Sequence, residues 1–178
     1  MLNRSPKALA GKIVDRIEGD LSNIKYEDEK LKKMLNGWKL DIEGVIARAA
    51  CGIHYKAYFD GGSTPNPGVM SIGGYIEEPH FDTIYSYSEV LGYGTNNQAE
   101  YSSLLHLCKA IVDHGIMKVT IHGDSSLVVN QVNGVFKAKE ANMIRLRDEV
   151  REVLSQVNGI WKLIHIPRAQ NKQADYLT

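Results

Sequence analysis

The hydrophobic periodicity of the sequence changes near Ala50, and this change limits the fold more than any other feature. Before it, apolar residues recur at the three- and four-residue spacing of amphipathic helices, in two groups over residues 13–24 and 31–46. After it, short apolar segments are separated by glycine and proline. We therefore predict a helical extension over residues 1–50 and a separate folded unit over residues 53–178.

The folded unit carries both strand and helix patterns. Strands are predicted over residues 54–59, 71–76, 83–90, 118–122 and 161–166, and helices over residues 97–114, 126–132 and 141–157. Three strands therefore come first as a meander, and helices and strands alternate after them. This order predicts an α/β fold in which a mixed sheet has helices on its faces.

Composition excludes several classes of protein. The 178 residues are 43% hydrophobic and 24% charged, which excludes a disordered chain. Lys plus Arg and Asp plus Glu both number 21, so any binding to nucleic acid must be local. The two cysteines show no metal-type spacing, and no segment approaches the roughly 18 apolar residues of a membrane span. We expect a cytoplasmic protein without a membrane segment.

Four acidic residues stand where strands are predicted to end or helices to begin. Asp60 and Asp124 end predicted strands, Glu100 lies in the first turn of a predicted helix, and Asp175 falls at the start of another. Each acid alone has an ordinary explanation as a turn, a cap or a solvated helix residue. Together they point to one edge of the sheet, where clustered carboxylates need a cation between them. Oxygen ligands favour magnesium or manganese, and such a site suits phosphodiester cleavage.

Four segments carry a specific resemblance. They read YFDGGSTPNPG at residues 58–68, TNNQAEY at 95–101, IHGDSSLVVNQVNG at 121–134 and HIPRAQNKQAD at 165–175. In this order they resemble the motifs of type 1 ribonuclease H, over about residues 54–178. The resemblance implies a five-stranded ribonuclease H-like sheet and metal-dependent cleavage of the RNA strand in RNA–DNA hybrids.

The resemblance also implies roles for individual residues. Asp60, Glu100, Asp124 and Asp175 match the four carboxylates that bind two Mg²⁺ ions in the family, with Mn²⁺ as a substitute. Asp60 would bridge the two ions, and the products would carry a 5′-phosphate and a 3′-hydroxyl. His165 matches a histidine that assists water entry or product release in some members, although a strand-end histidine in a hydrogen bond explains it equally well.

Candidate substrate contacts come from the same segments. They are Gly61, Gly62, Ser63, Asn66, Asn96, Asn97, Ser126, Arg168 and Lys172. Asparagine side chains at the starts of loops and helices can contact sugars and phosphates, and they are also common as caps of helices and turns. Ser126 stands where many members have glutamine, so that contact departs from the family pattern.

The chain lacks the basic, tryptophan-bearing protrusion of some relatives between Val132 and Trp161. Lys137 and Lys139 remain candidates for phosphate contacts. Two alternatives stay open: a catalytically weak nucleic-acid-binding domain of this fold, or a nuclease that prefers double-stranded RNA or junctions. For the helical extension, our hypothesis is that it mediates homodimerisation or covers the sheet.

Overall fold

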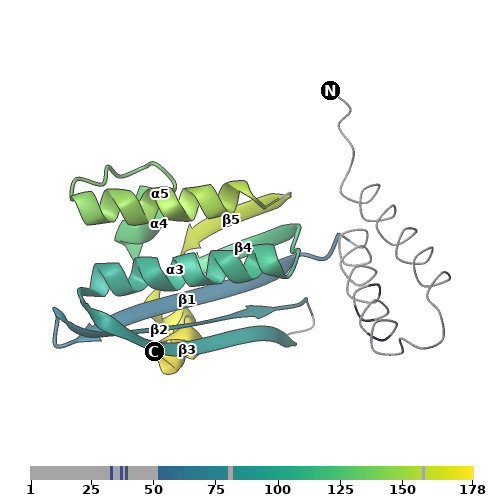
Figure 1. Cartoon of the computed structure of the whole chain (residues 1–178), viewed down its shortest axis with the longest axis horizontal. Helices are drawn as coiled ribbons and strands as arrows, with labels where there is room; N and C mark the ends of the chain where they lie inside the picture. Colours follow the sequence, from purple (N-terminus) through teal and green to yellow (C-terminus); the bar gives the residue numbers. More distant parts are fainter. Residues whose placement is uncertain (1–32, 34–36, 38, 40–51, 80–81, 158) are drawn as a thin grey trace. The chain divides into compact units, whose positions relative to one another are not determined.

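A computed structural model describes residues 33, 37, 39, 52–79, 82–157 and 159–178 of the chain (Figure 1). By its contacts the chain divides into two compact units, Met1–Gly52 and Ile53–Thr178. In the first unit Lys33, Gly37 and Lys39 are helical, as the predicted second helix requires. The remainder of the predicted helical extension, and its proposed role in dimerisation, lies outside the described residues.

The second unit contains a five-stranded mixed sheet. Its strands are β1 (Tyr55–Thr64), β2 (Gly68–Glu77), β3 (Thr83–Gly94), β4 (Lys118–Gly123) and β5 (Ile160–His165), in the order β3-β2-β1-β4-β5. The pairs β1–β2 and β2–β3 are antiparallel, whereas β1–β4 and β4–β5 are parallel. The predicted meander followed by parallel strands is therefore confirmed.

Helices flank this sheet (Figure 1). They are α3 (Asn96–Asp113), α4 (Ser126–Val132), α5 (Ala141–Ser155) and α6 (Lys172–Leu177), with a short 3₁₀ turn η1 (Arg168–Gln170) before α6. Helices α3 and α5 pack on each other, and α6 packs against β1 and β2. Eight residues, 133–140, join α4 to α5 without a further helix or strand, so no protrusion is inserted there. Among the described helices, none has the length and apolar character to cross a membrane.

The start of α3 is set by a reciprocal cap. The Gln98 amide N–H donates to the Thr95 hydroxyl at 3.3 Å, and the Thr95 amide donates to the Gln98 side chain at 2.8 Å. Each contact satisfies an amide that would otherwise lack a partner at the helix start. The helix consequently begins at Asn96, one residue before the predicted start.

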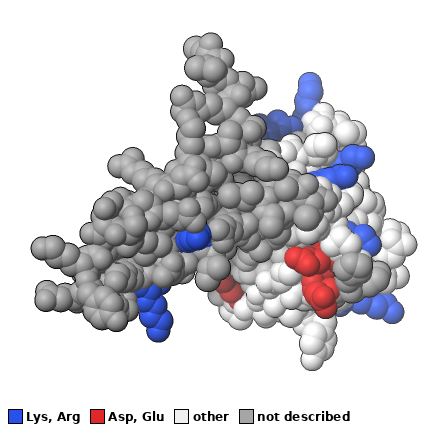
Figure 2. Space-filling model, turned by 90° about the vertical axis from the view of Figure 1, so that its right-hand side faces the viewer, with Lys and Arg blue, Asp and Glu red and all other residues white. Residues whose placement is uncertain are grey.

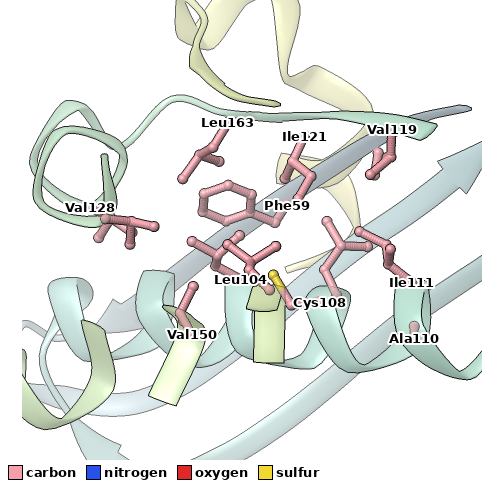
Figure 3. Packing of buried hydrophobic residues seen from close by; sticks show 14 of the residues in the cluster. Phe59, Leu104, Cys108, Ala110, Ile111, Val119, Ile121, Val128, Val150 and Leu163 are labelled. Atoms are coloured by element: carbon pink, nitrogen blue, oxygen red, sulfur yellow. The ribbon is translucent and has the colours of Figure 1, made fainter. Parts of the chain in front are cut away.

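The core lies between the sheet and α3 with α5. Figure 3 shows the Phe59 ring among Ile121 from β4, Leu163 from β5 and Leu104 from α3. All four side chains are almost fully buried. Gly123 fits beside this ring because a Cβ there would lie 2.3 Å from it. This packing fixes the register of β1, β4 and β5, on which the position of the acids depends.

The end of β1 differs from the prediction. We expected Asp60 to end the strand and Gly61 to begin a loop, and this was wrong, because β1 continues to Thr64. Strand β2 pairs with it over this whole length, from Asp60↔Gly73 to Thr64↔Val69. The parallel pairing with β4, in contrast, ends at Tyr58↔His122. Asp60 therefore lies inside a strand, but just beyond the end of its parallel neighbour.

Candidate active site

Asp60 and Asp124 meet because β1 and β4 are adjacent parallel strands. Asp60 lies two residues beyond the last β1–β4 pair, and Asp124 directly follows β4. Carboxyl ends of parallel neighbours open at the same edge of a sheet, which is where ligands commonly bind in α/β proteins. Asp60 is only 7% exposed, so its charge is held in a poorly solvated position.

Glu100 reaches the same edge through a close approach of α3 to β1. A Cβ at Gly61 would lie 2.5 Å from the Ala99 carbonyl carbon and oxygen, so only glycine allows this approach. One carboxylate oxygen from each of Asp60, Glu100 and Asp124 lies within 4.8 Å of the others. Glu100 is the fifth residue of α3, in its second turn, and the prediction of a first-turn position was therefore wrong.

Burial and mutual proximity disfavour the ionised form of two of these acids. Burial, with smaller contributions from the charges of Asp60 and Asp124, raises the pKa of Glu100 to about 9. Burial and the charge of Asp124 raise the pKa of Asp60 to about 6. The Oε2 atom of Glu100 is also buried without a hydrogen-bond partner among the described residues. An oxygen-only donor set with these properties fits a divalent cation of the magnesium type.

Asp175 is arranged differently from the other three acids. It is the fourth residue of α6, and its Oδ1 accepts a hydrogen bond from the Arg168 guanidinium. Asp175 is absent from the group whose oxygens lie within 4.8 Å, but it lines the same cavity. The Arg168 side chain is 79% exposed, so this ion pair is solvated and contributes little to holding Asp175 in place. We call Asp60, Glu100, Asp124 and Asp175 the acid cluster.

The acid cluster lines a cavity of about 540 Å³. Arg168, Ser63 and Asn96 line it as well, as do Gly61 and Gly62. The cavity therefore combines clustered carboxylates with the positively charged Arg168 side chain and neutral hydrogen-bonding groups. Figure 2 shows one face of the molecule, on which described Asp and Glu side chains form a small group and the described Lys and Arg side chains are scattered over several places.

Ser63, Asn66 and Asn96 form a hydrogen-bonded group, here called the asparagine network. The Asn96 Oδ1 accepts from the Ser63 amide at 2.7 Å and from the Ser63 hydroxyl at 3.1 Å. The Asn66 Oδ1 accepts from the Asn96 amide at 3.1 Å. Since backbone N–H groups only donate, both side-chain amides are fixed in orientation. Their Nδ2 groups have no acceptor within the described part of the chain, and they remain donors for a ligand.

Comparison with known proteins identifies the family. A family described as reverse transcriptase-like matches residues 59–178. Ribonuclease HI of Halobacterium salinarum is 33% identical over 159 residues, which cover 89% of this chain and 78% of that protein. This chain belongs to the ribonuclease HI family. The predicted resemblance to type 1 ribonuclease H is therefore confirmed.

Solved structures of this family agree with the fold. The crystal structure of RNase H1 from Halobacterium salinarum has a TM-score of 0.67 and 35% identity, covering 70% of this chain and 93% of that one. LC11-RNase H1, isolated from compost by a metagenomic approach and solved in complex with an RNA/DNA hybrid, has a TM-score of 0.65 and 31% identity. That match covers 69% of this chain and 92% of the relative. The ribonuclease H-like fold class is confirmed, and family membership together with the acid cluster indicates a divalent metal site.

Some predicted site residues lie outside the residues that line the cavity. They are Asn66, Asn97, Ser126, His165 and Lys172. Asn66 is joined to the cavity through the asparagine network, and His165 is exposed with its Nε2 3.2 Å from the Asp124 carbonyl oxygen. Ser126 begins α4 and accepts hydrogen bonds from the Asn130 amide, while Asn97 and Lys172 are exposed on their helices.

Two residues of the site, Asn171 and Thr178, were not predicted from the sequence. The Thr178 hydroxyl donates to the Asp60 Oδ2 at 3.1 Å. Asn171 is 1% exposed, and its Nδ2 donates to the Asp124 Oδ1 at 3.3 Å. Asn171 lies four residues before Asp175, inside the HIPRAQNKQAD segment that carries the family resemblance, and this position was a usable signal.

Proposed function

We propose that this chain is an endoribonuclease that hydrolyses the RNA strand of RNA–DNA hybrids in a reaction that requires a divalent cation. The observation that carries the proposal is the convergence of Asp60, Glu100 and Asp124 within 4.8 Å at one cavity. Family membership supports the reaction class, and the hybrid bound by the LC11 relative supports the substrate. In the reaction, a water oxygen loses a proton to the solvent and bonds to phosphorus, the bond from phosphorus to O3′ breaks, and the O3′ atom takes a proton from the solvent. The products therefore carry a 5′-phosphate and a 3′-hydroxyl.

The acid cluster is the proposed binding site for two Mg²⁺ ions, with Mn²⁺ as a substitute. When bound, such ions supply an activated water and stabilise the leaving oxygen. Asp60 is the most buried of the four acids and is the proposed bridging ligand. Asp175 is proposed to become a ligand by leaving Arg168, because a solvated ion pair is worth at most about 1 kcal/mol. Arg168 is then free to contact a substrate phosphate.

The asparagine network supplies the proposed contacts with the hybrid. Its Asn66 and Asn96 Nδ2 groups are donors, so they suit oxygen acceptors, such as phosphate oxygens and the 2′-hydroxyl that distinguishes RNA from DNA. Gly61 and Gly62 line the same cavity. His165 is exposed beside the Asp124 carbonyl, where its ring is proposed to assist the entry of water or the release of product.

Cleavage of labelled substrates tests the proposal. A uniform RNA–DNA hybrid, double-stranded RNA and single-stranded RNA are incubated with the full chain, first with Mg²⁺ and then with Mn²⁺. We expect cutting of the hybrid alone, and its loss in Asp124→Asn. Asp148→Asn is the matched control, because Asp148 is an exposed acid of α5 paired with Arg147 and it should cut normally. Preferred cutting of double-stranded RNA would replace the substrate assignment, and binding of the hybrid without cutting would overturn the enzyme assignment.

For residues 1–50 we propose dimerisation of the chain, because two apolar helical stripes in the sequence need a partner surface. Light scattering of the full chain should give the mass of a dimer. The chain beginning at Gly52 should give the mass of a monomer. Equal masses for the two would overturn this role.

A further inference from the structure

Asn171 contacts three of the four segments that carry the acid cluster. We propose that Asn171 is a positioning residue that sets the separation of Asp60, Asp124 and Asp175 and thereby the affinity of the site for its cation. The inference rests on the proposed function in that it takes these acids as cation ligands. It adds a residue that touches the acids without being a ligand itself.

The contacts of Asn171 reach β1, the end of β4 and α6. Its Nδ2 donates to the Phe59 carbonyl at 2.9 Å, one residue before Asp60 and 112 residues away in sequence. The same Nδ2 donates to the Asp124 Oδ1 at 3.3 Å. Its own carbonyl accepts from the Asp175 amide at 3.0 Å, at the start of α6. One side chain and its backbone therefore connect the three segments that carry Asp60, Asp124 and Asp175.

The position of Asn171 beside the end of the β1–β4 pairing explains why a hydrogen-bond donor is needed there. The β1–β4 pairing ends at Tyr58↔His122, so the Phe59 carbonyl lies beyond the last partner on β4. Asn171 supplies the hydrogen bond at this point, where a buried carbonyl without a partner would destabilise the folded state. An amide nitrogen has two hydrogens, so it serves the carbonyl and the carboxylate at once. A hydroxyl has only one hydrogen and could serve only one of them. A carboxylate has no hydrogen to donate and would be repelled by both oxygens.

The Asn171 Oδ1 atom indicates that this side chain contributes less to stability than to the position of the acids. Both neighbours of the Asn171 Nδ2 are acceptors, which fixes the amide orientation and directs the Oδ1 elsewhere. The Oδ1 is buried and has no hydrogen-bond partner among the described residues. An unpaired buried acceptor lowers the stability of the folded state. The favourable contacts of Asn171 are thus partly offset, and we expect its main effect to be on the geometry of the acids.

The matched control for this proposal is Asn133. Its Nδ2 also donates to a strand carbonyl, that of Leu163 at 2.9 Å, but it contacts none of the acids. Asn171→Ala and Asn133→Ala therefore each remove one hydrogen bond from a side-chain amide to a strand carbonyl. Only the first also removes a contact with Asp124.

The test measures Mn²⁺ binding by titration calorimetry and steady-state cleavage of an RNA–DNA hybrid, for the full chain and both variants. In Asn171→Ala we expect about 10-fold weaker Mn²⁺ binding, the loss typical of a residue that orients metal ligands. We also expect kcat to fall about 10-fold or more while KM for the hybrid changes less than threefold. Asn133→Ala should match the unaltered chain in both measurements.

Each other outcome decides between the hypotheses. Unchanged Mn²⁺ affinity in a folded Asn171→Ala would overturn the proposal, as would equal losses in both variants. Asn171→Ser, which keeps one donor, carries the same test if the alanine variant does not fold, and unfolding of both would show that Asn171 maintains the fold instead. If the unaltered chain binds Mn²⁺ but cuts no hybrid, the proposed function fails, and the Mn²⁺ affinities still decide the role of Asn171.

Discussion

The acid cluster and the asparagine network border the same cavity but differ in how far their hydrogen bonds and charges are balanced. In the asparagine network the Oδ1 atoms of Asn66 and Asn96 both accept hydrogen bonds. Asn96 is thereby joined to Ser63, and Asn66 is joined to the backbone of Asn96. In the acid cluster the pKa of Glu100 rises to about 9, and one of its oxygens is buried without a partner among the described residues. The asparagine network is thus already ordered, with only its Nδ2 donors left for a ligand, whereas the acid cluster needs a cation.

This difference separates the expected contributions of the two groups. Interactions that form only when the cation and the reacting phosphate are present act on the chemical step. A network that is already ordered before the substrate arrives mainly reduces the entropic cost of binding it. Substitutions in the acid cluster should therefore lower kcat, and substitutions in the asparagine network should raise KM.

The largest effect is expected for Asp60→Asn. It removes one charge from the most buried acid, and we expect the initial rate of hybrid cleavage to fall by at least about 10³-fold. Thermal stability without a cation should rise slightly, because the variant relieves repulsion from Asp124. A variant that kept its rate and its dependence on Mg²⁺ would remove Asp60 from the site.

Gly61→Ala tests whether the backbone approach of α3 to β1 sets the acid spacing. The new Cβ would meet the Ala99 backbone at 2.5 Å, so we expect a loss of about 1 to 3 kcal/mol in unfolding free energy. A displacement of Glu100 of about 1 Å would lower the cleavage rate about 10²-fold. Gly92→Ala is the control, because nothing lies within 4 Å of its Cβ position. Chemical denaturation and rate measurements that fail to separate the two variants would contradict this explanation.

The pH dependence of stability tests the charge imbalance directly. In the cation-free protein Glu100 keeps its proton up to about pH 9, whereas in the unfolded chain it loses the proton near its ordinary value of 4.5. The folded state binds more protons over this range, so the free energy of unfolding should fall as the pH rises from 5 to 9. Melting curves in a chelator should show this decrease, and a smaller one for Glu100→Gln. Added Mg²⁺ should restore more stability at pH 9 than at pH 5.

The smallest effect is expected in the asparagine network. Asn96→Ala removes one donor to the substrate and the acceptor for Ser63, and we expect KM for the hybrid to rise about 5-fold, equivalent to a hydrogen bond of about 1 kcal/mol. The kcat value should stay within about twofold. A fall in kcat as large as that of Asp60→Asn would show that the two groups do not divide binding and chemistry.

Much of the fold could be predicted because its hydrophobic spacing is regular. The strands around Ala57, Ile121 and Leu163 alternate inward-facing apolar residues, and α3 has a strong apolar stripe. The meeting of Asp60 and Asp124 followed from the general geometry of adjacent strand ends. These features depend on local sequence and on rules that hold for all sheets.

The remaining features depend on contacts between distant segments. Gly61 has no apolar side chain to mark a strand, and β1 continues through it only because β2 pairs along the same length. Asn171 has the sequence of an ordinary helix start, and its role arises from a carbonyl 112 residues away. The pairing of Asp175 with Arg168 likewise depends on how η1 and α6 turn. No local pattern distinguishes such contacts from their common structural alternatives.

The connection of Asn171 to the Phe59 carbonyl has a consequence for the order of events during synthesis. Asp60, Glu100 and Asp124 leave the ribosome well before residues 160–177. Because domains fold as units, a nascent chain that ends before Asn171 holds three crowded acids without the amide that links the Phe59 carbonyl to Asp124. The ability to bind a cation tightly should therefore appear late, when β5 and α6 are added. Metal binding by ribosome-bound chains of increasing length would then report the completion of the catalytic unit.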